Sequence, residues 1–111
     1  MSYFVVFVTA PSAEEASRIA RAVVGERLAA CASVIPSIAS AYWWQGVVEE
    51  ASEALIILKT RQDLLEPLTR RVRALHSYTV PEVIAVPIAG GNPDYLRWLE
   101  DLTATAEEPG R

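Results

Sequence analysis

The chain has 111 residues, a formal net charge of −4 at pH 7, and 51% of its residues in the apolar set AVILMFWYC. This length allows a single domain with a core of its own, and the composition excludes collagen-like, mucin-like and disordered chains. An acidic chain with only ten Lys and Arg residues lacks the clustered basic surface of a nucleic-acid-binding protein, so we expect no nucleic-acid partner. The apolar fraction is slightly above the usual range, which indicates apolar surface that a partner covers.

The first predicted elements are a strand and an amphipathic helix. Residues 3–9 form a short, continuous apolar run that is typical of a central strand. Ser12 begins the helix, and we expect a capping box in which its side chain accepts from the amide of Glu15 while the Glu15 carboxylate reaches back. The helix is expected to end near Glu26. Its apolar face consists of Ala16, Ile19, Ala20, Val23 and Val24.

A long β-hairpin is predicted next. One strand covers residues 28–35, and Pro36 predicts a bulge or bend because proline cannot donate to a strand ladder. The strand continues over residues 38–44, turns at Gln45-Gly46 and returns over residues 47–60. Both faces of this hairpin carry apolar side chains, and its strands are much longer than the usual ~5–6 residues.

The second half of the sequence predicts two helices separated by a loop and a strand. Asp63 is expected to cap the second helix, whose apolar stripe is Leu64, Leu68, Val72 and Leu75. Residues 76–81 form a loop and residues 82–89 the last strand. Asn92-Pro93 begins a third helix. Its inward side chains are expected to be Tyr95, Leu96, Leu99 and Leu102.

The order of these elements, β-α-β-β-α-β plus a C-terminal helix, predicts an α+β, ferredoxin-like split βαβ fold. We expect one domain over residues 1–105 and a frayed acidic tail over residues 106–111. One face of such a sheet lies open in a single chain, and both hairpin faces are apolar. A closed symmetric assembly of identical chains would cover both surfaces.

A single cysteine, Cys31, excludes an intrachain disulfide and agrees with a reducing compartment. The apolar run at residues 3–8 has no basic flank and is too short for a signal peptide or a membrane span. We therefore expect a cytoplasmic protein with no membrane association.

His76 is the only histidine, and the loop that it begins also contains Tyr78 and Glu82. An imidazole, a phenol and a carboxylate on one loop could bind a metal or move a proton. The alternative is a helix-ending histidine that forms local hydrogen bonds. A closed zinc site needs four nitrogen or sulfur ligands, so one His and one Cys could supply a metal site only between subunits.

Three further residues are candidates for a ligand site. Cys31 is either a soft-metal ligand or nucleophile, or a small buried hydrophobe. Lys59 either faces a ligand or pairs with a carboxylate, and Trp44 either lines a ligand site or packs at an interface. The hairpin carboxylates are interpreted as a solvated edge: Glu49, Glu50 and Glu53. No nucleotide-binding or hydrolase motif is present, so no enzyme activity and no obligatory cofactor are expected.

Six segments of the sequence resemble the CutA family of divalent-cation tolerance proteins. They are VTAPS at 8–12, LAAC at 28–31, SAYWWQG at 40–46, LKT at 58–60, HSYTVPE at 76–82 and YLRWL at 95–99. The resemblance implies a ferredoxin-like fold assembled as a tight trimer similar to PII signalling proteins. It also implies a role in tolerance of divalent cations, copper above all, with no catalytic reaction.

The sequence departs from the family pattern around the expected metal site. Ser77 replaces the usual proline of a His-Pro-Tyr sequence, which predicts a looser loop, and Val8 and Leu75 stand where some members have a Cys and a second His. The remaining metal candidates are His76, Cys31 and Glu82.

We hypothesise a homotrimer that binds a cation such as Cu²⁺, or a small ligand, in clefts between subunits. The tentative lining of such a cleft is His76, Tyr78, Glu82, Lys59, Cys31 and Trp44, with His76 as the metal ligand. The alternatives are an interaction scaffold or PII-like signalling module without metal chemistry, and an enzyme with His76 as general base.

Overall fold

The computed structural model describes residues 2–103, so the tail predicted at 106–111 lies outside the described residues. It contains one antiparallel four-stranded sheet with the strand order β2-β3-β1-β4. The strands are β1 (Tyr3–Ala10), β2 (Cys31–Trp44), β3 (Val47–Arg61) and β4 (Val83–Pro87). The helices are α1 (Ala13–Gly25), α2 (Leu65–Leu75) and α3 (Pro93–Leu102). This order and strand pairing confirm the predicted split βαβ plan.

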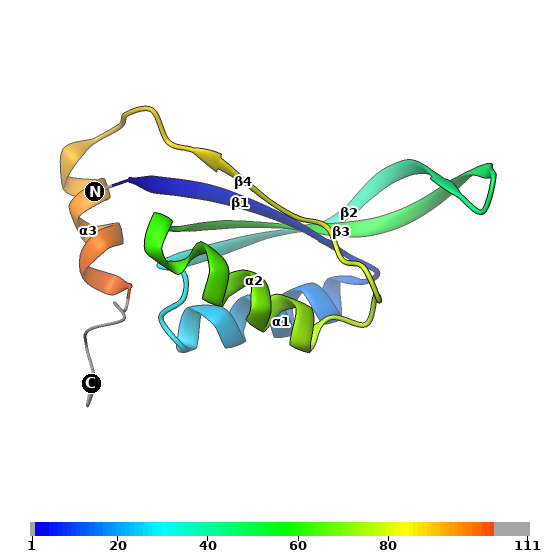
Figure 1. Cartoon of the computed structure of the whole chain (residues 1–111), viewed down its shortest axis with the longest axis horizontal. Helices are drawn as coiled ribbons and strands as arrows, with labels where there is room; N and C mark the ends of the chain where they lie inside the picture. Colours follow the sequence, from blue (N-terminus) through cyan, green and yellow to red (C-terminus); the bar gives the residue numbers. More distant parts are fainter. Residues whose placement is uncertain (1, 104–111) are drawn as a thin grey trace.

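The core lies between one face of the sheet and the two helices α1 and α2, which lie on the same side of it (Figure 1). The predicted apolar face of α1 packs there, with Val24 only half-buried. The sheet contributes alternate residues of β1 and β3, as the two-residue period of a strand requires. The largest fully buried side chains in this layer are Ile19, Ile56, Leu58, Leu68, Val6, Val8, Val23 and Val72. No helix within residues 2–103 is long and apolar enough to cross a membrane.

The capping box predicted for α1 is only half formed. The Ser12 hydroxyl accepts from the amide of Glu15 at 3.1 Å, as expected. The Glu15 carboxylate instead accepts from the amide and the hydroxyl of Ser77, both at 2.9 Å. A side chain in the first turn of α1 is therefore used to hold a segment 62 residues away.

The strand predicted from residue 28 begins three residues later. Arg27 adopts a left-handed conformation, with φ of 61°, and the chain turns through residues 28–30. The Thr60 hydroxyl donates to the carbonyl of Leu28 at 2.6 Å and holds this turn on β3. Strand β2 then begins at Cys31, where it pairs with Lys59.

The bulge predicted at Pro36 is present. Ile35 pairs with Leu55 and Ile38 pairs with Glu53, so β2 has one residue more than β3 over this interval. An extra residue of this kind bends the strand and increases its local twist. Beyond the bulge, the hairpin projects away from the helices (Figure 1).

Asp63 does not cap the second helix, so that prediction is wrong. Residues 62–64 form a turn of 3₁₀-helix before α2, and the residue at the N-cap makes no side-chain hydrogen bond. Because Asp63 lies inside that turn, its carboxylate is too early in the chain to cap α2. It lies 3.5 Å from the buried guanidinium of Arg61. Pro67 lies in the first turn of α2, where its missing N–H removes no intrahelical hydrogen bond.

The last strand is shorter than the predicted residues 82–89, whereas the third helix begins as expected. The Asn92 side chain accepts from the amide of Asp94 at 3.0 Å and caps α3. Because α3 lies at the end of the sheet opposite the hairpin turn (Figure 1), only part of its surface is covered. Leu99 is fully buried and Leu96 is half-buried, but Tyr95 and Leu102, both expected to face inward, are exposed.

Candidate functional site

His76 follows the last residue of α2 and its side chain is fully buried. Its Nδ1 atom accepts from the amide of Tyr78 at 3.0 Å, and its Nε2 atom lies 2.7 Å from the carbonyl oxygen of Thr9. These partners assign the neutral tautomer with the proton on Nε2, which donates to Thr9. Both ring nitrogens are thus in hydrogen bonds with the main chain.

The Glu15 carboxylate lies beside the imidazole. Its Oε2 atom is 3.4 Å from Nδ1 of His76 and accepts both donors of Ser77. Burial opposes ionisation of this carboxyl, but the two hydrogen bonds from Ser77, aided by the charge of Arg18, hold the pKa of Glu15 below its usual value. The carboxylate is also favoured by the N-terminal end of the α1 dipole.

Tyr78 connects the loop to the hairpin. Its ring lies 4.7 Å from that of His76, and its hydroxyl donates to Oε2 of Glu53 at 2.8 Å. Burial, followed by the hydrogen bond to Glu53, holds the pKa of Tyr78 well above its usual value, so the phenol remains a donor. Glu53 is buried, so its interpretation as part of a solvated edge is wrong, whereas Glu49 and Glu50 are exposed as expected.

We call the set Glu15, Glu53, His76 and Tyr78 the clasp. It joins α1, the end of β1, the loop after α2 and the base of the hairpin. Hydrogen bonds join His76 to Tyr78 and Tyr78 to Glu53, while Glu15 is held beside the imidazole by its hydrogen bonds from Ser77.

Cys31 and Lys59 lie at the other end of the core. They are directly opposite each other on β2 and β3, and both are half-buried. The Cys31 sulfur lies 3.4 Å from the Tyr95 hydroxyl, and this contact, together with burial, raises the pKa of Tyr95 to about 12. Lys59 lies four positions along β3 from Leu55, the partner of Thr9, which corresponds to ~13 Å.

Trp44 is far from both of these places, whereas Glu82 directly precedes Val83, which pairs with Val8 beside Thr9. Glu82 is exposed and makes no hydrogen bond or ion pair with any residue that the structure describes. Trp44 is exposed next to the hairpin turn, where it pairs with Val47, six residues or ~20 Å along β3 from Glu53. One chain thus brings His76 to Tyr78, and Cys31 to Lys59, but does not join these pairs to Trp44.

The residues present in one chain do not fit a metal ion at His76. Across residues 2–103, no three His, Cys, Asp or Glu side chains are grouped so that they could hold a metal ion. The only ring nitrogen with a lone pair, Nδ1, already accepts from Tyr78, and the ring is inaccessible. A cation at this nitrogen would have to break that hydrogen bond.

Ser77 contributes two hydrogen bonds at the position where the family pattern has proline. It supplies an amide N–H, which proline lacks, and a hydroxyl, and both donate to Glu15. These two bonds oppose the loosening expected from the loss of the proline ring.

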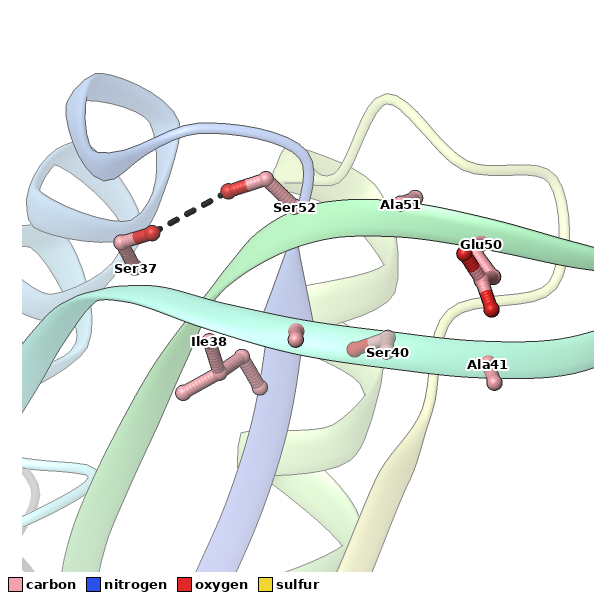
Figure 2. Close-up of a pocket in the computed structure, with 8 residues that line it drawn as sticks. Ser37, Ile38, Ser40, Ala41, Glu50, Ala51 and Ser52 are labelled. Carbon is pink, nitrogen blue, oxygen red and sulfur yellow. Dashed lines mark hydrogen bonds between the residues drawn. The ribbon is translucent and has the colours of Figure 1, made fainter.

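A shallow hollow of about 500 Å³ lies on the projecting hairpin. Figure 2 shows that small side chains line it, and that a hydrogen bond of 3.1 Å between the hydroxyls of Ser37 and Ser52 crosses between the strands. Glu50 is its only charged side chain among the described residues. The hollow is suited to packing against another surface rather than to holding an ion.

Comparison with known proteins identifies the family. The family model of the CutA1 divalent ion tolerance protein matches residues 4–102. The chain belongs to this family. Its structure is similar to that of CutA1 from Oryza sativa, with a TM-score of 0.92, 49% identity, and coverage of 94% of this chain and 95% of the other. It is also similar to the divalent cation tolerance protein of Thermus thermophilus, with a TM-score of 0.90, 50% identity, and coverage of 92% and 99%.

The curated relatives differ in length. The Thermus thermophilus divalent-cation tolerance protein CutA is 52% identical over 89% of this chain and 96% of its own length. The chloroplastic CutA 1 of Oryza sativa is also 52% identical over 89% of this chain, which spans only 56% of that protein. The name of the Thermus thermophilus protein states tolerance of divalent cations, and that of the Oryza sativa protein states the family name. Neither name states a reaction. The family and fold predicted from the sequence are therefore confirmed.

Proposed function

We propose that this protein is a homotrimer that acts in divalent-cation tolerance by holding a cation such as Cu²⁺, or a small ligand, in clefts between its subunits in the cytoplasm. The observation that supports it is the unpartnered apolar surface of a single chain that belongs to the CutA1 family. The Archaeoglobus fulgidus relative, 39% identical with a TM-score of 0.88, is described as a periplasmic divalent cation tolerance protein, so the compartment needs its own test.

The apolar surface that one chain leaves exposed is extensive. On the sheet face opposite α1 and α2, Ile35, Ile84 and Val86 are between 40% and 53% exposed. The residues around the hairpin turn, which we call the tip, are exposed by 43–74%: Tyr42, Trp43, Trp44, Val47 and Val48. Monomeric proteins rarely expose contiguous apolar patches of this kind, and a closed ring of identical copies covers the same patch on each.

The length of the hairpin supports a ligand cleft between copies. The tip extends ~20 Å past the clasp of its own chain, so Trp44 is placed to reach a neighbouring chain. In the proposed assembly, the clefts between copies also take residues that a single chain keeps apart from Trp44: Tyr78, Glu82, Lys59 and Cys31. In this arrangement Glu82 is the exposed carboxylate available to a cation.

Two measurements test this proposal. Sedimentation at micromolar concentration is expected to give the mass of three chains, and a monomer would contradict the assembly and the clefts that depend on it. Calorimetric titration of the assembly with Cu²⁺ is expected to show saturable binding that is weaker in Glu82→Gln. The absence of any binding heat in the native assembly would contradict the cation role.

The hollow on the hairpin favours a second candidate function. Because it contains one charged side chain and is lined by small residues, a protein surface suits it better than an ion does. An interaction scaffold or PII-like signalling module would retain a stoichiometric partner from lysate and bind no Cu²⁺. Binding of Cu²⁺ without a retained partner would contradict this alternative.

A further inference from the structure

The hydrogen bonds of His76 connect two segments of main chain that are far apart in the sequence. The Nε2 atom donates to the carbonyl of Thr9 at the end of β1, and the Nδ1 atom accepts from the amide of Tyr78 in the loop. The ring itself has no exposed surface. A histidine with one free nitrogen can bind a metal while the other nitrogen donates to a carbonyl. Here the second nitrogen, Nδ1, also takes part in a hydrogen bond, so neither ring nitrogen is available to a metal.

The environment of the ring opposes a cation as well. The nearest carboxylate oxygen, Oε2 of Glu15, already accepts two hydrogen bonds from Ser77. A cation at Nδ1 would displace the Tyr78 amide and compete with both Ser77 donors. Three hydrogen bonds would be broken or weakened before the first metal bond forms.

The position of Tyr78 depends on this ring. The hydrogen bond from its amide sets the main chain, its own ring lies beside the imidazole, and its hydroxyl then meets Glu53. Tyr78 is the only hydrogen-bond partner of the buried Glu53 side chain within the described residues. The orientation of the loop is thereby linked to the base of the hairpin.

We infer that His76 is a positioning residue, which fixes the loop and the base of the hairpin through its two main-chain hydrogen bonds, and that it is not the ligand of a cation. Only the statement that His76 is not a cation ligand rests on the proposed function. The positioning role does not depend on whether a cation binds anywhere.

Two substitutions test the roles of the two ring nitrogens separately. His76→Asn places an amide oxygen where Nδ1 lies and keeps an acceptor for the Tyr78 amide, whereas His76→Gln reaches the position of Nε2 and keeps a donor for Thr9. We expect the Tyr78 amide of His76→Asn to exchange its hydrogen at close to the native rate. In His76→Gln the exchange is expected to be about tenfold faster, as the loss of one hydrogen bond implies. Equal exchange rates in the two variants would contradict the inference.

A measurement on the native protein covers the case in which the variants do not fold. The nitrogen spectrum of the His76 side chain is expected to show the tautomer that the hydrogen bonds assign, with an unprotonated Nδ1 and a protonated Nε2. A protonated Nδ1 would contradict the positioning role.

Calorimetric titration with Cu²⁺ distinguishes failure of the inference from failure of the proposed function. If the native assembly binds Cu²⁺, His76→Asn is expected to bind it with the same affinity within about twofold. A tenfold loss of affinity in His76→Asn, with the Tyr78 amide still protected, would overturn the inference. If the native assembly does not bind Cu²⁺, the cation role fails and the exchange rates alone decide the role of His76.

Discussion

At the base of the β2–β3 hairpin, Glu53 is a buried carboxylate with a partner in its own chain, the hydroxyl of Tyr78. At the tip of the same hairpin, Trp43 and Trp44 are 74% and 58% exposed and pack on nothing that would bury them within the described residues. The base therefore places polar groups in the interior and satisfies them, whereas the tip places apolar groups on the surface and leaves them uncovered. A chain completes the first arrangement by itself, whereas the second leaves apolar area in water that a partner surface would bury in the proposed assembly.

The largest effect is expected at the tip. Trp43→Glu places a charge on a surface that the proposed assembly would bury, so the proposed trimer should dissociate at micromolar concentration, as measured by sedimentation. Since Trp43 is mostly exposed in a single chain, the far-ultraviolet circular dichroism of the variant should remain that of a folded protein. The control is Arg97→Glu on α3, an exposed residue whose one ion pair within residues 2–103 is with Asp94. A trimer of unchanged mass in Trp43→Glu would show that the tip is not the assembling surface.

The next largest effect is expected at the base. Tyr78→Phe keeps the ring but removes the donor, which leaves the buried Glu53 carboxylate unpartnered and should lower the free energy of unfolding by ~1–3 kcal/mol. Thr79→Val, which removes an exposed hydroxyl that makes no hydrogen bond within the described residues, is the control from the same loop and should change it far less. Urea unfolding of both variants gives the comparison. Equal losses would mean that the hydrogen bond at the base adds no stability of its own.

The contrast between base and tip was only partly visible in the sequence. The turn was predicted because its signal is local: Gln45 and Gly46 have positive φ values of 50° and 84°, as a tight hairpin turn requires. The apolar tip is predictable because successive residues of a strand point to opposite faces, and apolar residues occupy both faces here. The partner of Glu53 was not predicted, because three carboxylates of the hairpin look alike in the sequence and Tyr78 lies 25 residues from the one that it contacts.

The same limit applies to the other half of the clasp. Glu15 was assigned to its local cap because the capping motif is contained in four residues, whereas its contact with Ser77 depends on the packing of α1 against the end of α2. The prediction that Asp63 caps the second helix is wrong for a related reason. The buried Arg61, two residues earlier, attracts the Asp63 carboxylate, and a 3₁₀ turn precedes the helix. Local patterns therefore predicted the elements and their order, while the contacts that close the site are long-range.

A smaller, pH-dependent effect is expected where Ser77 holds Glu15. Ser77→Ala removes one of two hydrogen bonds and should lower the free energy of unfolding by about 1 kcal/mol at pH 7. Because the pKa of Glu15 is lowered in the folded protein, its contribution is present above the ordinary glutamate pKa of about 4.3 and is lost as pH falls through the lower folded value. Unfolding measured from pH 7 to pH 2 should therefore show the native and Ser77→Ala curves converging in acid. A difference that stays constant down to pH 2 would mean that the hydroxyl acts without regard to the charge of Glu15.

The smallest effect is expected far from both ends of the hairpin, at an ion pair on the outer surface of α2. The Arg70 guanidinium lies 2.7 Å from the Glu66 carboxylate, but the two side chains are 64% and 86% exposed. Water and salt screen such a pair, so Arg70→Gln should change the free energy of unfolding by less than ~0.5 kcal/mol, and less still in 1 M NaCl. Urea unfolding at low and high salt measures this, with Glu66→Gln as the reciprocal control. A loss comparable to that of Tyr78→Phe would contradict the comparison, because it would show that an exposed pair stabilises this chain as much as the buried hydrogen bond at the base.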